Sequence, residues 1–278
     1  MKAESGQTSR RILCVFPRYT KSFGTFQHSY PLMDDVAAFM PPQGLLVIAA
    51  YLPPEWSVRF VDENIRPATE DDFVWADAVF VSGMHIQRQQ MNDICSRAHA
   101  FDRPVALGGP SVSACPDYYP NFDYLHVGEL GDATDQLIAR LAHDVSRPKR
   151  QIVFTTEDRL DMALFPIPAY ELAECGRYLL GSIQYSSGCP YQCEFCDIPG
   201  LYGRNPRLKT PEQIITELDR MVECGIRGSV YFVDDNFIGN RKAALELLPH
   251  LVEWQKRTGF ALQLACEATL MCAMRQIN

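Results

Sequence analysis

Three closely spaced cysteines constrain this chain more than any other feature of its sequence. Cys189, Cys193 and Cys196 lie within eight residues, directly after the strand-like run 181–186, on a loop that also contains glycine and proline. Thiolates at this spacing can converge on one inorganic centre. Structural zinc normally takes four protein ligands, usually as two separated pairs, and no second pair is obvious here. A cubane iron–sulfur cluster held by three cysteines keeps one iron free for an outside ligand.

Composition narrows the class of protein. The chain has 278 residues, enough for two domains, and its 47% apolar content is typical of a globular protein. No apolar run approaches the length of a membrane span, and residues 1–10 predict a short disordered lead-in rather than a signal peptide. The net charge of −8 comes without a basic block, which argues against a nucleic-acid partner. The cysteines outside the cluster loop are scattered, so we expect a reducing cytoplasm.

The first half of the chain alternates apolar strands with helices. Strands are expected at 11–16, 58–61, 78–81, 105–107 and 124–127, and helices at 45–52, 89–100 and 133–143. This alternation predicts an α/β fold with a doubly wound, Rossmann-like parallel sheet of five strands. Small residues follow the strand ends repeatedly, at the edge where such sheets bind ligands, although plain turns would explain them equally well. A GxGxxG dinucleotide fingerprint is absent after the first strand.

The second half repeats the alternation after the cysteine loop. A helix is expected at 211–223 with Thr210 as its N-cap, followed by a strand at 229–233, a helix at 241–257 and a strand at 260–265. Polar residues at successive strand ends are typical of a (β/α) barrel site. They are Asp234, Asp235, Asn236 and Glu267. The basic residues Arg204, Arg207 and Lys209 either frame this site or form a solvated loop. Residues 144–170 form a linker in which 151–154 could add one strand.

The CxxxCxxC spacing, with Phe195 just before the last cysteine, resembles the signature of the radical S-adenosylmethionine (SAM) enzymes. The resemblance implies that Cys189, Cys193 and Cys196 ligate a [4Fe–4S] cluster. It also implies that the amino and carboxylate groups of SAM chelate the fourth iron. The residues that it assigns to SAM binding are Phe195, Asp234, Asp235, Asn236 and Glu267.

The strand–helix domain upstream of the motif resembles a cobalamin-binding domain. The resemblance implies that the nucleotide tail of the corrin enters the carboxyl edge of the sheet, lined by Ser82, Gly83, Gly108, Gly109 and Gly128. His85 either faces the corrin or is an ordinary hydrogen-bonding loop residue. The DxHxxG cobalamin motif is absent, because the segment 62–67 reads DENIRP and offers no histidine as a lower axial ligand.

Several further segments are similar to one subgroup of this superfamily, the hopanoid C-2 methylases. These segments are 22–26, 39–45, 62–64, 82–87, 194–198 and 232–239, and the likeness runs from Arg11 to Leu270. It implies a methyltransferase that uses a 5′-deoxyadenosyl radical and methylcobalamin to methylate the A ring of a polycyclic lipid, the hopanoid. A flavodoxin- or ferredoxin-type electron donor and at most peripheral contact with the inner membrane would follow, although no amphipathic anchor is evident.

The resulting domain prediction has three parts. Residues 10–145 form the cobalamin-binding domain, 146–177 a linker, and 178–278 the first part of a radical SAM barrel. A barrel needs about 200 residues or more, so we expect a truncated or frameshifted product whose own catalysis is doubtful. Three alternatives stay open. They are a sibling methylase or cyclase acting on a tetrapyrrole or another natural product, a non-catalytic cofactor-binding remnant, and a zinc-binding module.

Overall fold

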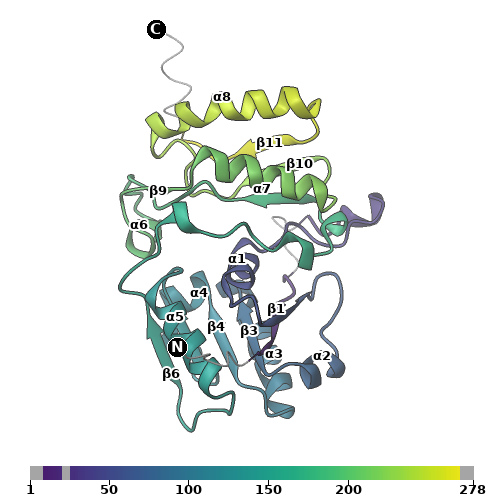
Figure 1. Ribbon diagram of the computed structural model, residues 1–278, viewed down its shortest axis with the longest axis vertical. Helices are drawn as coiled ribbons and strands as arrows, with labels where there is room; N and C mark the ends of the chain where they lie inside the picture. Colours follow the sequence, from purple (N-terminus) through teal and green to yellow (C-terminus); the bar gives the residue numbers. More distant parts are fainter. Residues whose placement is uncertain (1–8, 21–25, 270–278) are drawn as a thin grey trace, which may run out of the picture. The chain divides into compact units, whose positions relative to one another are not determined.

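The computed structural model describes residues 9–20 and 26–269, which fall into two compact units. The first unit contains residues 9–20 and Gly44–Leu160, and the second contains Phe26–Gln43 and residues 161–269. Each unit is built on a parallel sheet, so the predicted α/β class is confirmed (Figure 1). The expected lead-in before Ser9, the similar segment 22–25 and the residues after 269 lie outside the described residues.

The first unit has a six-stranded parallel sheet with the order β2-β1-β3-β4-β5-β6. The strands are β1 (Arg11–Phe16), β2 (Ser57–Asp62), β3 (Ala78–Ser82), β4 (Val105–Gly108), β5 (Tyr124–Val127) and β6 (Ile152–Thr155). Five strands were predicted. The sixth comes from the part of the linker in which a strand was considered possible, and it pairs with β5 from Tyr124↔Ile152 onward. The linker therefore contributes its strand to the first sheet.

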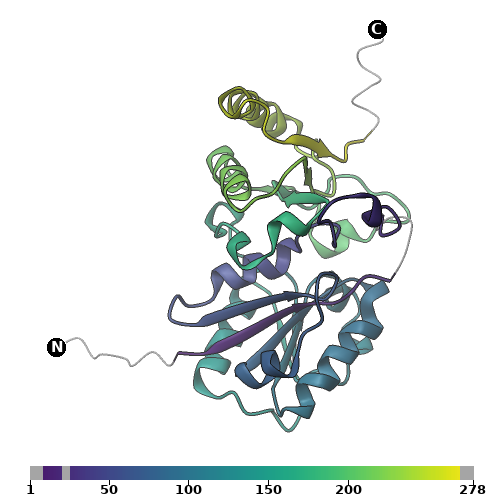
Figure 2. The same cartoon turned by 90° about the vertical axis from the view of Figure 1, so that its right-hand side faces the viewer.

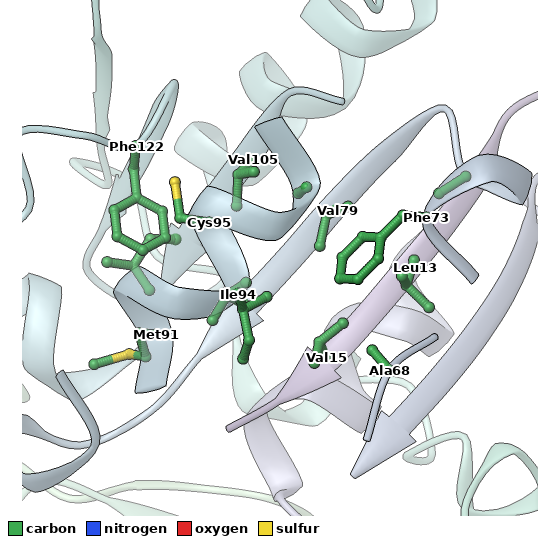
Figure 3. Packing of buried hydrophobic residues seen from close by; sticks show 14 of the residues in the cluster. Leu13, Val15, Ala68, Phe73, Val79, Met91, Ile94, Cys95, Val105 and Phe122 are labelled. Carbon is green, nitrogen blue, oxygen red and sulfur yellow. The ribbon is translucent and has the colours of Figure 1, made fainter. Parts of the chain in front are cut away.

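Helices cover both faces of this sheet. The helices are α1 (Gln43–Tyr51), α2 (Glu70–Trp75), α3 (Arg88–Ala100), α4 (Pro110–Ala114) and α5 (Asp132–His143). Tyr51 Oη on α1 donates to Asp135 Oδ1 on α5 at 2.9 Å, so these two helices are neighbours. The main apolar cluster packs Phe73 of α2 and Ile94 of α3 against β1 and β3, and it contains no residue of α1 or α5 (Figure 3). The sheet is thus buried on both sides, as parallel sheets usually are.

The second unit has a three-stranded parallel sheet with the order β11-β10-β7. Its strands are β7 (Leu180–Ile183), β10 (Ser229–Phe232) and β11 (Gln263–Cys266), and its main helices are α7 (Pro211–Glu223) and α8 (Arg241–Thr258). The two helices lie side by side along one face of the sheet (Figure 2). This follows from right-handed crossovers between strands that are adjacent in both sequence and space. Among the described residues, none of the helices combines the length and the hydropathy needed to span a membrane.

Short elements complete the two units. A two-stranded antiparallel ladder joins β8 (Ser186–Ser187) to β9 (Arg207–Leu208), with α6 (Ile198–Leu201) between them in the sequence. The 3-10 helices are η2 (Tyr30–Leu32), η3 (His85–Gln87), η4 (Pro116–Tyr118), η5 (Met162–Leu164), η6 (Tyr170–Leu172) and η7 (Cys175–Arg177).

Helix α7 begins and ends at the predicted residues. Thr210 and Gln213 form a capping box in which the Thr210 Oγ1 accepts from Gln213 N at 3.2 Å, and the Gln213 Oε1 accepts from Thr210 N at 2.8 Å. Met221 faces the interior of the unit, whereas the neighbouring Val222 is 39% exposed. Glu217 also lies on this buried face, which is unusual for a carboxylate.

Candidate functional site

The cysteine loop starts and ends at the β8–β9 ladder. Ser187 pairs with Arg207, so the loop between them closes on itself at its base. Gly188 follows β8 with φ +97°, and a Cβ there would lie 2.8 Å from the carbonyl oxygen of Gly203. Cys189 N donates to the same oxygen at 3.1 Å. Only glycine permits this close approach, so the position of the first cysteine is set by the backbone of the returning arm.

The three predicted cluster cysteines are all free thiols on this one loop. Cys193 is exposed, and Cys189 and Cys196 are half-buried. Cys196 N donates to Cys193 O at 3.1 Å, which makes a tight turn between the second and third cysteines. In the described parts of the chain, no three His, Cys, Asp or Glu side chains are gathered as a metal ion would require. The donor set nevertheless fits an iron–sulfur cluster, since such clusters are held by cysteine thiolates.

Phe195, the aromatic of the motif, lies on the same loop and is 91% exposed.

Asp234 follows β10 and is turned into the protein. Its carboxylate accepts a hydrogen bond from Tyr185 N at 2.9 Å, and from both the N–H and the hydroxyl of Ser186. Burial raises the pKa of Asp234 to about 6, opposed by these hydrogen bonds and reinforced by the charge of Asp235. The side chain thus ties the entry arm of the cysteine loop to the end of β10.

The two residues after Asp234 differ in their partners. Asp235 Oδ2 accepts from Gly188 N at 3.3 Å, next to the first cysteine. Asn236 is only 3% exposed, and neither its Oδ1 nor its Nδ2 has a hydrogen-bond partner among the described residues. Buried amides are nearly always satisfied, because leaving one unpaired costs about 1–3 kcal/mol. The unsatisfied amide of Asn236 therefore indicates a place where a polar ligand group would bind.

Glu267 lies just beyond β11 and is exposed. Its Oε1 accepts from Tyr231 Oη at 2.7 Å, and its backbone oxygen accepts from Phe237 N at 3.0 Å. Burial and the neighbouring Glu267 together raise the pKa of Tyr231 to about 12. The structure thus brings Glu267 to the segment that carries Asp235 and Asn236, at the carboxyl edge of the second sheet.

The predicted cobalamin positions lie at the carboxyl edge of the first sheet. Gly109 has φ +93°, and a Cβ there would collide with the side chain of Ser82. Gly128 has φ +107°, and its N–H donates to Ser113 Oγ at 2.9 Å, while that hydroxyl donates to Gly109 O at 2.9 Å. The ends of β3, β4 and β5 are thus linked through the side chains of Ser82 and Ser113, which contact the glycine backbone.

Gly83 and Gly108 behave differently from the other glycines of this edge. A Cβ on Gly83 would lie 3.0 Å from both Met91 Sδ and Pro17 Cγ, whereas a Cβ on Gly108 would meet nothing closer than His126 Cβ at 3.8 Å. A side chain at Gly83 would require Met91 and Pro17 to shift by a few tenths of an ångström, whereas Gly108 leaves free space at the edge.

His85 is exposed in the loop after β3, and the structure gives it a protein partner. Its Nδ1 lies 2.8 Å from Ser111 Oγ on α4, and Ser111 in turn contacts the hydroxyl of Tyr119. The sequence left two roles open for His85, and one of them was an ordinary hydrogen-bonding loop residue. The hydrogen bond between His85 and Ser111 agrees with that role.

Two polar clusters of the second unit have pairings that were not predicted from the sequence. Gln43 Nε2 donates to the backbone oxygen of Ser182 and lies 2.5 Å from Tyr170 Oη, which itself donates to Ser182 O at 2.8 Å. Lys209, for which the sequence left open a place framing the site or in a solvated loop, is instead buried beside Glu217. The signal for this second pair was present in the helix periodicity, since Glu217 falls in line with Ile214, Leu218 and Met221.

Sequence comparison identifies close relatives, although no family model matches. The chain is 93% identical over 275 residues to the hopanoid C-2 methylase of Rhodopseudomonas palustris strain TIE-1, covering 99% of this chain and 52% of that protein. It is 38% identical over 262 residues to an uncharacterized methyltransferase of Synechocystis sp. PCC 6803. This match covers 94% of this chain and 48% of that protein. A bacteriochlorophyllide d C-12(1)-methyltransferase of Chlorobaculum tepidum is 26% identical over 227 residues, covering 78% and 48%. The chain thus spans about half the length of these relatives.

Two solved structures of radical SAM enzymes have a similar fold. The radical SAM methyltransferase TsrM of Kitasatospora setae, with cobalamin and a [4Fe–4S] cluster bound, matches with a TM-score of 0.66 at 18% identity, over 92% of this chain and 54% of that one. The cobalamin-dependent radical SAM enzyme OxsB, with aqua-cobalamin and SAM bound, matches with a TM-score of 0.62 at 16% identity. This match covers 88% of this chain and 37% of the OxsB chain. These matches show that the fold is shared.

The likeness to the hopanoid C-2 methylases inferred from the sequence is thus confirmed by the sequence comparison, and the structural comparison confirms the fold. Over 99% of its length, this chain is a close relative of the hopanoid C-2 methylase of Rhodopseudomonas palustris.

Proposed function

We propose that this chain carries the cofactor-binding half of a cobalamin-dependent radical SAM C-methyltransferase, whose intact form methylates hopanoid lipids at C-2 of the A ring. The observation that carries the proposal is the CxxxCxxC loop between β8 and β9, in a chain 93% identical to a hopanoid C-2 methylase. Residues 10–145 would form the cobalamin-binding domain, 146–177 a linker, and 178 onward the start of the barrel.

The chain's own residues would bind and orient the cofactors rather than perform acid–base chemistry. Cys189, Cys193 and Cys196 would hold a [4Fe–4S] cluster, and the amide of Asn236 would bind a polar group of SAM. When bound, the three cofactors supply the electron, the carbon radical and the methyl group. Asp234 would not touch SAM itself, because its carboxylate is occupied by Tyr185 and Ser186. Its role is to hold the loop's entry arm in place.

At the first sheet, the chain would supply a small, neutral surface for the tail of cobalamin. Ser82, Gly108, Gly109 and Gly128 present little side-chain bulk, and the positive φ of Gly109 and Gly128 lets backbone approach backbone. Such an edge would leave room for the tail of a large ligand to bind between the ends of the strands. Gly83 and His85 lie in the loop after β3, at the same edge.

The partners follow from the proposed chemistry. The substrate would be a polycyclic lipid, and a flavodoxin- or ferredoxin-type protein would reduce the cluster. We propose a cytoplasmic location with peripheral contact at the inner membrane, where such a lipid resides. The relatives that act on bacteriochlorophyllide favour one second candidate, a methyltransferase for a tetrapyrrole, at much lower identity than the hopanoid relative.

Anaerobic iron–sulfur reconstitution tests the proposal. We expect about four iron atoms and four sulfides per chain, with an electron paramagnetic resonance signal that changes when SAM is added. Alanine at Cys189, Cys193 or Cys196 should abolish the signal, whereas Cys224→Ala, at the end of α7, should leave it unchanged. Zinc without sulfide would contradict the proposal. Assays of the full-length protein on hopanoids and on porphyrins would then separate the two substrate classes.

A further inference from the structure

A lysine–glutamate ion pair lies in the interior of the second unit. Lys209 Nζ is 2.5 Å from Glu217 Oε1, and the two side chains are 0% and 1% exposed. Burial raises the pKa of Glu217, opposed by the charge of Lys209. The free energy needed to remove two charges from water is about as large as the free energy gained from their attraction. A buried ion pair therefore adds little net stability compared with an apolar pair of equal volume. Its presence here calls for another explanation.

Lys209 lies at the base of the cysteine loop. It directly follows β9, and its N–H donates to the carbonyl oxygen of Tyr185 at 2.9 Å, which extends the β8–β9 ladder by one step. Tyr185 precedes β8, the strand that enters the loop. Lys209 therefore sits where the arm that enters the loop and the arm that leaves it come together.

Glu217 is the fixed end of the pair. It lies on α7 among Ile214, Leu218 and Met221, each 0% exposed. The helix itself is held by its capping box at Thr210 and by the ion pair between Asp219 on α7 and Arg257 on α8, at 2.8 Å. The Glu217 Oε2 has no hydrogen-bond partner among the described residues, so the carboxylate depends on Lys209 for its pairing.

The base of the loop is thus held from two sides. Asp234, at the end of β10, holds the entry arm through Tyr185 N and Ser186 N. Glu217, on α7, holds the return arm through Lys209. The return arm supplies the carbonyl oxygen of Gly203 that receives the N–H of Cys189. A shift of β9 by one residue would move this acceptor and would turn side chains to the opposite face.

We propose that Lys209 and Glu217 are positioning residues, whose buried ion pair fixes the register of β9 and so sets the placement of Cys189 relative to Cys193 and Cys196. This inference rests on the proposed function, in which the loop holds the cluster. A buried charge pair suits the task better than an apolar contact, because slippage would leave two charges unpaired in the interior. Outer residues that orient ligands in this way typically change metal affinity about 10- to 100-fold when replaced.

The test compares the wild type with the double variant Lys209→Met/Glu217→Leu, which removes both charges at similar volume. After reconstitution, the variant should lose iron to a chelator roughly tenfold faster than the wild type, although its urea midpoint stays near the wild-type value. Hydrogen exchange over residues 186–209 of the apoprotein should also be faster. This second readout does not require a cluster.

Leu218→Ala is the matched control, because it removes a fully buried side chain from the next position of the same helix. It should lower the urea midpoint while leaving iron loss and loop exchange unchanged. The inference is overturned if the double variant retains iron and exchanges hydrogen like the wild type. It is also overturned if Leu218→Ala changes iron loss and loop exchange as much as the double variant does. If the wild type binds no cluster but the double variant still exchanges faster, the positioning role stands and the proposed function fails.

Discussion

The two sheets of this protein present different chemistry at their carboxyl edges. At the edge of the first sheet, the residues at the ends of β3, β4 and β5 are small, with Gly109 against the Ser82 side chain and Gly128 N bonded to the Ser113 hydroxyl. The edge of the second sheet carries carboxylates, an unsatisfied amide and the loop of thiols, with Asp234, Asn236 and Cys189 as its main groups. Both edges follow the same alternation of strands and helices. The few residues after each strand therefore decide what an edge can bind.

The sheets also differ in how completely they are buried. All residues of β1 after Arg11 are buried, whereas β11 is exposed along most of its length. Leu264, Ala265 and Cys266 of β11 line an apolar groove of about 330 Å³, together with Leu248 and Val252 of α8. The second unit has an apolar core of its own, with Ile214, Leu218 and Trp254 buried, and adds specific polar links such as those of Asp234.

Among the substitutions that test the difference between the two edges, we expect the largest loss of stability at Asp234. Asp234→Ala leaves two backbone N–H groups and one hydroxyl without an acceptor in a buried place. At about 1–3 kcal/mol for each unsatisfied group, the free energy of unfolding should fall by at least about 3 kcal/mol, as measured by urea unfolding of the apoprotein. Ser82→Ala at the other edge should cost less than about 1 kcal/mol. Equal losses would show that the edges do not differ in this way.

The pH dependence of Asp234 sharpens the same prediction. Because the folded-state pKa is about 6 rather than the usual 3.8, the folded protein keeps a proton that the unfolded chain releases between these values. The contribution of Asp234 to stability is therefore full below about pH 4 and is lost as the pH rises through about 6, by up to about 3 kcal/mol. Asp234→Asn cannot ionise, so its unfolding free energy should lack this fall. Parallel pH profiles for the two proteins would contradict the assignment.

A smaller effect is expected at Gly109 in the first sheet. Gly109→Ala should cost about 2 kcal/mol, because φ is +93° and the new Cβ meets the Ser82 side chain. It should also lower the amount of cobalamin retained after gel filtration. Ser82→Gly/Gly109→Ala removes the collision but not the backbone strain, so it should recover part of the loss. Gly44→Ala is the control, since a Cβ there meets nothing within 4 Å. A loss of cobalamin in that variant would contradict the argument.

The smallest losses of stability are expected when the helix caps are removed. These losses should be equal in the two units, because each unit contains a capping box that begins with a threonine. Thr69 caps α2 by accepting from Asp72 N at 3.4 Å, and Thr210 caps α7 by accepting from Gln213 N at 3.2 Å. Alanine at either position should lower the free energy of unfolding by about 1 kcal/mol. Serine, which keeps the hydroxyl, should restore most of it. Neither change should alter the binding of iron or cobalamin, and a specific loss of iron in Thr210→Ala would show that the cap has a further role.

Most of the secondary structure could be predicted from the sequence, because it depends on local patterns. The limits of β5 and α7 agree with the prediction to the residue, since an apolar run and a Thr-Pro cap define them without reference to the rest of the chain. Helix α2 was missed, although Thr69 and Asp72 form a capping box, because the helix has only six residues and carries three acidic residues in its first turn. The short helix α4 was missed for the same reason of length.

The sequence by itself determined the cysteine loop, the strand–helix alternation and the likeness to the hopanoid C-2 methylase. Only the tertiary structure decided which partners the polar residues find. It turned Asp234 toward Ser186, 48 residues away, and it buried Lys209 against Glu217 rather than leaving it in a solvated loop. It also placed the strand β6 in the first sheet and the segment Phe26–Gln43 in the second unit. The physical reason is that periodicity and caps are local, whereas pairing between charges and strands depends on where distant segments meet.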